Sequence, residues 1–161
     1  TSALGKFAGV ARRFEFRGEQ NNVVYVDDYA HLPTEVSSVL AAAKVGEWQR
    51  VVAVFQPHRF SRTAQLWKDF ADSFVDADHV VLTGIYGAGE TPQPGITGEL
   101  VARAVLEANP HTSLTYISER NQVAEYLDSV LQPGDLCLTM GAGDLTSVAD
   151  EVQHRRKALD K

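Results

Sequence analysis

The sequence predicts an α/β fold: a Rossmann-like, doubly wound sheet of about six strands, mostly parallel with one antiparallel strand, and helices on both faces. Five short apolar runs are each followed by a segment with helical spacing of apolar residues, which is the order of a parallel sheet covered by helices. The runs are nearly continuous in apolar residues, as expected of strands buried on both faces. The 161 residues, of which 44% are hydrophobic and 22% charged, fit one globular domain.

The first elements are predicted to form a hairpin. A short apolar piece spans residues 4–10, and Phe14 and Phe16 then alternate with charged residues over 12–17, the period-two pattern of a half-exposed strand. Turn-forming residues at 18–22 separate this strand from the apolar run 23–26. Two strands with a loop of about five residues between them suggest an antiparallel hairpin.

The remaining elements alternate helices with strands. Pro33 opens a helix with apolar residues at helical spacing, and Gly46 ends it. A second helix carries Leu66, Phe70 and Phe74 at four-residue spacing. Further strands are expected at 51–55, 79–82, 114–117 and 136–140. Further helices are expected at 98–108, over a segment that carries Val123, Tyr126, Leu127 and Val130, and from about 144 to 159.

Composition argues against several classes of protein. The net charge of −6 disfavours a broad nucleic-acid-binding surface, and no apolar run approaches the roughly 18 residues of a membrane span.

The single cysteine, Cys137, cannot form an internal disulfide, which favours the reducing cytoplasm. Arg155, Arg156 and Lys157 fall in the last turn of the final helix, where cations complement the helix dipole. The chain lacks an initiator Met, so we expect it to be part of a longer protein.

Polar and glycine-rich segments gather at the carboxyl ends of the predicted strands. They occupy residues 27–31, 56–63, 83–90 and 141–144, whereas the loops at the opposite edge contain ordinary turn residues. Open α/β sheets bind ligands at the carboxyl ends of their strands. We therefore expect a ligand site there, with the second and third strands near neighbours whose following loops share a crevice.

Each candidate residue at this edge has a structural alternative. Asp28 could cap a turn or bind a ligand. The carboxylate of Asp27 beside it repels that of Asp28 and has no evident structural role. Arg59 and Arg62 flank a helix start, where cations oppose the dipole. An anion held between them and the helix amides is favoured over a solvated face. His31 is as often a structural histidine as a functional one.

Other chemistries fit the residues less well. The turn at 141–143 resembles a phosphate-binding turn, but so short a glycine pattern is a weak signal. A zinc site from His31, His58 and Asp28 lacks the ligand spacing of metal sites, so no metal ligand is assigned. Ser61 and His58 as a nucleophile pair lack a nucleophile elbow and an orienting acid.

Four segments together resemble a known family. They are GVARRFE at 9–15, DDYAHLPTE at 27–35, VFQPHRFSRT at 54–63 and GAGD at 141–144. In this order they closely resemble the C-terminal domain of the Mur ligases, over essentially the whole chain. The resemblance implies that residues 1–161 are a single domain that contacts the amino acid and the nucleotide. Residues 1–11 would be the hinge from a central ATPase domain absent from this chain.

The resemblance also implies an activity, that of an ATP-dependent, amide-forming ligase of the bacterial cytoplasm in peptidoglycan precursor synthesis. ATP with Mg²⁺, bound mainly by the central domain, would phosphorylate the carboxylate of UDP-N-acetylmuramate. The amine of L-alanine would then attack the acyl phosphate. No Gly-x-x-Gly-Lys-Thr phosphate loop occurs in the chain, so the domain alone is expected to be inactive. Neither nucleic acid nor membrane is an expected partner.

Motif positions in the resemblance assign roles to five residues. Asp28 would hydrogen-bond the ATP ribose, and Arg13, assigned to catalysis and to ATP binding, would reach toward the phosphates from the hinge. His31, Arg59 and Arg62 would line the L-alanine site, where a guanidinium is suited to the α-carboxylate.

One departure and two alternatives accompany this assignment. Leu32 stands where the family motif usually has a second histidine. The resemblance also implies that the loop 86–90 would flank the alanine pocket. A ligase of the same family that recycles murein tripeptide shares the Asp-Asp-x-Ala-His pattern but departs from Gln-Pro-His-Arg after the third strand. A stand-alone, non-catalytic binding module is the other alternative.

Overall fold

The computed structural model describes residues 12–161, which form one six-stranded sheet in the order β1-β2-β6-β3-β4-β5. Only the β1–β2 pair is antiparallel, and the other neighbours are parallel. The predicted six-stranded, mostly parallel sheet is therefore confirmed. The strands are β1 (Glu15–Gln20), β2 (Val23–Asp28), β3 (Arg50–Phe55), β4 (His79–Thr83), β5 (Leu114–Ile117) and β6 (Asp135–Met140).

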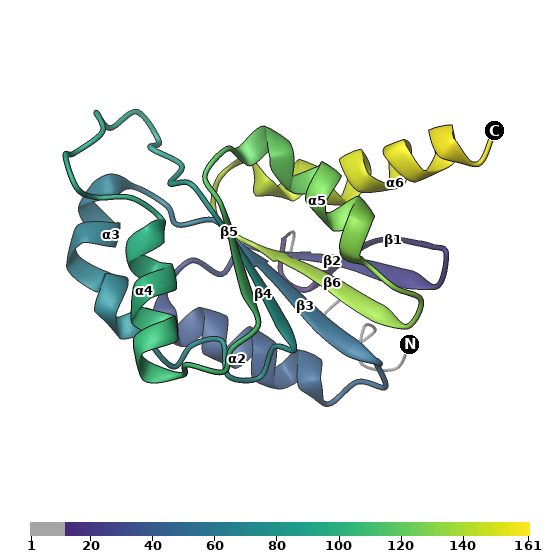
Figure 1. The fold of residues 1–161 in the computed structure, drawn as a ribbon, viewed down its shortest axis with the longest axis horizontal. Coiled ribbons are helices and arrows are strands. Elements are labelled where there is room, and N and C mark those ends of the chain that lie inside the picture. The colour runs from purple at the N-terminus through teal and green to yellow at the C-terminus, as the bar shows by residue number, and fades with distance from the viewer. Residues whose placement is uncertain (1–11) are drawn as a thin grey trace.

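Helices cover both faces of this sheet, as predicted (Figure 1). One layer contains α2 (Pro33–Lys44), α3 (Phe60–Leu66) and α4 (Glu99–Ala108), and the other contains α5 (Val123–Val130) and α6 (Val148–Leu159). Three short 3₁₀ segments complete the fold: η1 (Trp67–Phe70), η2 (Arg120–Gln122) and η3 (Asp144–Ser147). Within residues 12–161 no helix is long and apolar enough to cross a membrane.

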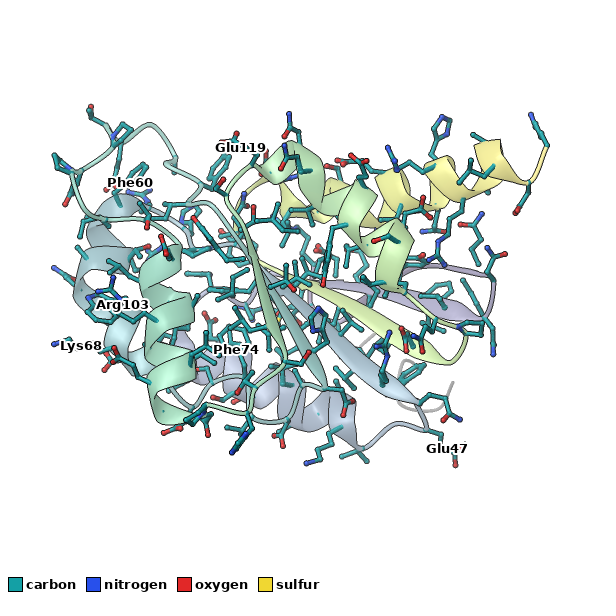
Figure 2. The ribbon with its side chains drawn as sticks, in the orientation of Figure 1. Glu47, Phe60, Lys68, Phe74, Arg103 and Glu119 are labelled. Atoms are coloured by element: carbon teal, nitrogen blue, oxygen red, sulfur yellow. The ribbon has the colours of Figure 1, made fainter. Side chains whose placement is uncertain are left out.

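Two hydrophobic cores lie on either side of the sheet, because successive side chains of a strand point to opposite faces. In the central strand β3, Val51, Ala53 and Phe55 join the core beneath α2 and α4. Val52 and Val54 join the core beneath α5 and α6. The continuous apolar run of β3 thus reflects burial on both faces. Figure 2 shows the side chains that fill the two layers.

The β1–β2 hairpin differs from the prediction of a strand at 12–17 and a five-residue loop. The first strand extends to Gln20, and the chain turns through Asn21 and Asn22, whose φ angles are +53° and +60°. Asparagine tolerates this left-handed conformation, which matches the twist of a two-residue hairpin. Gly18 (φ +133°) marks a β-bulge within the strand instead of a turn. The apolar piece at 4–10 and the hinge at 1–11 lie outside the described residues.

Two predicted helices are shorter than their apolar spacing suggests. The helix expected to carry Leu66, Phe70 and Phe74 ends at Leu66, and a 3₁₀ segment follows. Phe70 and Phe74 still pack on Phe55, with ring centroids 5.1 and 5.6 Å away. The final helix begins at Val148 and not near 144, because a 3₁₀ turn precedes it. The four-residue spacing thus indicated burial correctly but not helical hydrogen bonding.

The strand order brings the loops after β2, β6 and β3 to neighbouring positions at the carboxyl edge. β6 lies between β2 and β3. The second and third strands are therefore near each other, but they do not pair directly. After β2 and β3 the chain enters the α2–α4 layer, and after β6 it enters the opposite layer with α6 (Figure 1). Such a reversal is where open α/β sheets bind ligands.

Candidate functional site

Asp28, at the end of β2, is a buried residue that closes a turn. Its side chain is 3% exposed, and its carboxylate accepts hydrogen bonds from the N–H groups of Phe14 and Ala30, both at 2.8 Å. Burial raises the pKa of the Asp28 carboxyl, and the two amide hydrogen bonds oppose that rise. The geometry is that of the turn-capping alternative, and it ties the segment before β1 to the end of β2.

Asp27 proves to be an internal acceptor. Its carboxylate accepts hydrogen bonds from the hydroxyls of Thr139 (2.6 Å) and Thr146 (2.9 Å) and pairs with the guanidinium of Arg12 at 3.3 Å. Arg12 also donates to the carbonyl of Gly141 at 2.7 Å. The prediction that the second carboxylate has no structural return is therefore wrong. Asp27 joins three segments that meet at the carboxyl edge.

Arg13 and His31 meet at Glu35 in the first turn of α2. Glu35 Oε2 lies 3.6 Å from Arg13 Nη1, and Glu35 Oε1 lies 3.7 Å from His31 Nδ1. Glu35 Oε1 also accepts the N–H of Leu32 at 3.1 Å. Sequence reasoning missed Glu35, although a glutamate three residues after a helix start is a capping signal. The structure thus brings Arg13 and His31 together through a shared carboxylate.

His58 and Arg62 form a second pair beside His31. Arg62 Nη1 lies 2.9 Å from His58 Nδ1, and because arginine can only donate, Nδ1 accepts and the ring proton is on Nε2. The His58 ring stacks on Tyr86, with centroids 5.7 Å apart, and lies 5.9 Å from the His31 ring. Burial, followed by the charge of Arg62, lowers the pKa of His58. Arg62 is thus committed to His58.

Acidification is expected to weaken this arrangement. Because the pKa of His58 is lowered in the folded protein, the unfolded chain takes up the proton first as pH falls below about 6.5. The free energy of unfolding therefore decreases as pH falls from about 6.5 toward the folded-state pKa. His58→Gln should remove part of this decrease, measured by urea unfolding at about pH 7 and 5.5. Equal losses in the two proteins would contradict the lowered pKa.

The start of α3 already holds an anion, supplied by the chain. Glu90, from the loop after β4, accepts the N–H of Ser61 at 3.0 Å and its hydroxyl at 2.5 Å. These hydrogen bonds lower the pKa of Glu90. The external anion expected between Arg59, Arg62 and the helix amides is therefore replaced at the amides by Glu90. The sequence contains no sign of this pairing, because the two residues lie 29 positions apart.

Arg59 is exposed, and its guanidinium makes no hydrogen bond or ion pair within residues 12–161. Its backbone adopts φ +73° and ψ 138°, which side-chain-bearing residues rarely do. The main chain is held on both sides: the Arg59 N–H donates to Tyr86 O at 2.8 Å, and the carbonyl accepts the N–H of Thr63 at 3.1 Å. A cation on a fixed backbone, with no ion pair in the described part of the chain, is suited to an anionic group from another molecule.

Tyr86 covers the centre of the edge because residue 143 is glycine. A Cβ atom on Gly143 would lie 2.5 Å from Tyr86 Cγ and 2.8 Å from Gln56 Oε1. Gln56 donates through Nε2 to Asp144 at 3.0 Å, and its Oε1 is buried without a hydrogen-bond partner. The glycine turn after β6 therefore serves close packing between the loops after β3, β4 and β6.

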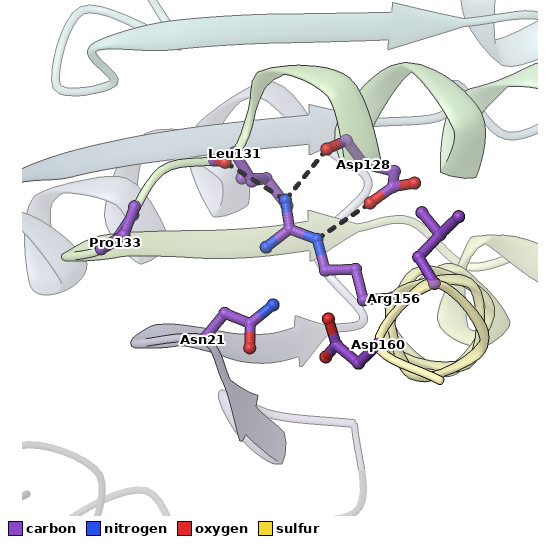
Figure 3. Close-up of a pocket in the computed structure, with 7 residues that line it drawn as sticks. Asn21, Asp128, Leu131, Pro133, Arg156 and Asp160 are labelled. Carbon is purple, nitrogen blue, oxygen red and sulfur yellow. Dashed lines mark hydrogen bonds and ion pairs between the residues drawn. The ribbon is translucent and has the colours of Figure 1, made fainter.

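A pocket of about 360 Å³ lies at the opposite edge of the sheet, beside the end of α6 (Figure 3). Arg156 borders it with only 7% of its surface exposed. Its Nε donates to Asp128 Oδ1 at 3.0 Å, and Nη2 donates to the carbonyls of Asp128 (3.0 Å) and Leu131 (3.1 Å). Complementing the helix dipole is thus an incomplete explanation of Arg156, which fastens α6 to the end of α5. None of the predicted site residues lines this pocket.

Comparison with known proteins agrees with the motif order. The family model described as Mur ligase, glutamate ligase domain, matches residues 12–143. The chain is 48% identical over 153 residues to the UDP-N-acetylmuramate–L-alanine ligase of Geobacter sp. (strain M21), covering 94% of this chain and 33% of that protein. It therefore spans about a third of the length of the curated relatives it matches.

Solved structures show the same fold. The UDP-N-acetylmuramate–alanine ligase of Thermotoga maritima is 26% identical with a TM-score of 0.76, over 98% of this chain and 32% of that one. The murein peptide ligase of Psychrobacter arcticus, at 24% identity, has a TM-score of 0.72 over 95% of this chain and 31% of that one, a likeness of fold alone. The chain therefore belongs to the Mur ligase family, and it matches the C-terminal domain of the UDP-N-acetylmuramate–L-alanine ligases.

Proposed function

We propose that this chain is the amino-acid-binding domain of an ATP-dependent ligase that joins L-alanine to UDP-N-acetylmuramate. The activity of the curated relatives supports this function. The observation that carries it is the Arg59 guanidinium at the carboxyl edge of the sheet, which has no hydrogen bond or ion pair among the described residues 12–161. Amide formation requires that the α-carboxylate of alanine be held while its amine stays free to attack. A guanidinium binds a carboxylate through two parallel hydrogen bonds and leaves an amine untouched.

The residues assigned to the alanine site act differently within this proposal. Arg59 binds the α-carboxylate directly. Arg62 acts through its 2.9 Å hydrogen bond to His58, which fixes the ring so that Nε2 carries the proton. His31 lies beside this ring, with the centroids 5.9 Å apart, and forms the other wall of the site. The geometry therefore favours a site in which Arg59 alone binds the carboxylate and the rings of His58 and His31 form its walls. It favours this over a site in which three side chains contact the substrate equally.

The nucleotide contacts fit less evenly. Asp28 is 3% exposed and already accepts two main-chain N–H groups, so its carboxylate as described does not fit an ATP ribose. Arg13 fits better, because its side chain is 46% exposed and its partner Glu35 lies 3.6 Å away. Within residues 12–161 no three His, Cys, Asp or Glu side chains gather as metal ligands. We therefore assign Mg²⁺ and most of the triphosphate to a part of the enzyme outside this chain.

Activity assays test the proposed function. The full-length protein, given ATP, Mg²⁺, UDP-N-acetylmuramate and L-alanine, is expected to release ADP and phosphate as the muramoyl–alanine amide forms. The 161-residue chain alone is expected to hydrolyse no ATP, because it contains no Gly-x-x-Gly-Lys-Thr loop. Measurable ATPase turnover by the purified chain would contradict the assignment of phosphoryl transfer to a part of the enzyme outside this chain. Product formation with murein tripeptide but not with L-alanine would assign the protein to peptide recycling.

A further inference from the structure

The loops after β3 and β4 run side by side beyond the end of the sheet. His58 and Tyr86 form an isolated parallel bridge. Tyr86 N–H donates to the carbonyl of Pro57 at 2.9 Å, and Arg59 N–H donates to the carbonyl of Tyr86 at 2.8 Å. The backbone of Arg59 is therefore shaped by a loop that is distant in sequence.

Glu90 connects the loop after β4 to the start of α3, beyond the His58–Tyr86 bridge. Its carboxylate binds both the N–H and the hydroxyl of Ser61, two residues after Arg59. Close packing supports the contact, since a Cβ atom on Gly87 would lie 3.1 Å from the ring of Phe60. Phe60 lies at the end of α3 nearest the β4–α4 loop (Figure 2). The backbone of Arg59 is thus held between its hydrogen bond to the Tyr86 carbonyl and the Glu90–Ser61 contact two residues later.

The conformation of Arg59 depends both on its hydrogen bond to the Tyr86 carbonyl and on the Glu90–Ser61 contact. A residue with a side chain persists at φ +73° only where surrounding contacts over-determine it. If the Glu90 contact were lost, the start of α3 could shift and Arg59 could relax toward an ordinary backbone conformation. Its guanidinium would then leave its present position.

We infer that Glu90 is a positioning residue for amino-acid binding: through Ser61 it holds the start of α3 against the β4–α4 loop, so that Arg59 presents its guanidinium to the substrate carboxylate. This inference rests on the proposed function, which places the carboxylate at Arg59. Glu90 itself touches no substrate. Its side chain acts through hydrogen bonds to Ser61, which an uncharged glutamine can also form, because the serine hydroxyl both donates and accepts.

Steady-state kinetics of the full-length enzyme test the inference. Glu90→Ala and Ser61→Ala should each raise the alanine KM, by roughly tenfold for Glu90→Ala, because a small displacement of a binding group is costly. The KM values for ATP and UDP-N-acetylmuramate should stay nearly constant. Glu90→Gln should restore most of the affinity for alanine. Glu107→Ala removes a glutamate from the exposed face of α4, away from this contact, and is the matched control that should leave the kinetics unchanged.

One further variant, Arg59→Lys, and a hydrogen-exchange measurement separate the possible failures. If Arg59→Lys leaves the alanine KM unchanged, the proposed function fails and the inference falls with it. If Arg59→Lys raises the alanine KM and Glu90→Ala does not, the positioning role alone is wrong. A large defect in Glu90→Gln with none in Ser61→Ala would instead make Glu90 a direct charge contact of the substrate. Hydrogen exchange at the Ser61 amide should accelerate in Glu90→Ala, and unchanged exchange would overturn the inference independently of activity.

Discussion

Arg156→Ala is expected to lower the free energy of unfolding by about 3 kcal/mol, more than a hundredfold in the folding equilibrium. Arg156 is 7% exposed, and its guanidinium donates to the Asp128 carboxylate and to two carbonyls at the end of α5. Its removal leaves Asp128, whose side chain is 16% exposed, without its principal partner. Equilibrium urea unfolding of the chain measures the change.

Arg155 provides the matched control. Its guanidinium lies 3.8 Å from the same carboxylate, but its side chain is 46% exposed, and exposed pairs contribute about 0–1 kcal/mol. A loss in Arg155→Ala as large as that in Arg156→Ala would contradict the assignment. The double variant Arg156→Met with Asp128→Leu should recover most of the stability, because replacing a buried pair by apolar residues is often neutral.

Arg59→Lys in the full-length enzyme is expected to raise the alanine KM by roughly tenfold to a hundredfold, because losing one charge-assisted hydrogen bond costs about 1.5–3 kcal/mol. A lysine keeps the charge but cannot reproduce the two-pronged contact with a carboxylate. The KM values for ATP and UDP-N-acetylmuramate should change far less, since those ligands are assigned mainly to other domains. Varying each substrate in turn measures the three values separately.

Arg59 could instead act on the phosphates. In that case the substitution would depress kcat with the alanine KM nearly unchanged, the pattern of an interaction made only in the transition state. Arg59→Lys should not unfold the protein, because the side chain is exposed and makes no hydrogen bond or ion pair within residues 12–161. An unchanged alanine KM would remove Arg59 from the amino-acid site.

Periodicity was sufficient to predict those elements whose structure depends on local sequence and burial. The strand at 114–117 and the helix from Pro33 have the predicted bounds, because an apolar run and an N-terminal proline are local signals. The insertion of β6 between β2 and β3 could not be predicted, because strand order depends on contacts among distant segments. Gly18 was assigned to a turn instead of a bulge because glycine, which adopts positive φ freely, is common in both.

For the candidate site, the sequence predicted that polar residues gather at the carboxyl edge of the sheet, but not which partners they contact. Asp27 and Thr139 are 112 positions apart, and Glu90 and Ser61 are 29 apart, so neither contact leaves a local pattern. The dipole argument predicted an external anion between Arg59, Arg62 and the amides at the start of α3, and it could not show that Glu90 of the same chain binds the Ser61 amide. Arg62 was assigned to the alanine site, while its observed partner, His58, was considered only for other chemistry.

The most direct test is a crystal structure of the full-length protein with L-alanine bound. The carboxylate of alanine is expected at hydrogen-bond distance from both terminal nitrogens of Arg59, about 2.7–2.9 Å, with the amine directed away from the guanidinium. Glu90 should remain on Ser61 and Arg62 on His58. An alanine carboxylate bound elsewhere, with Arg59 on a phosphate or in solvent, would contradict the proposed site.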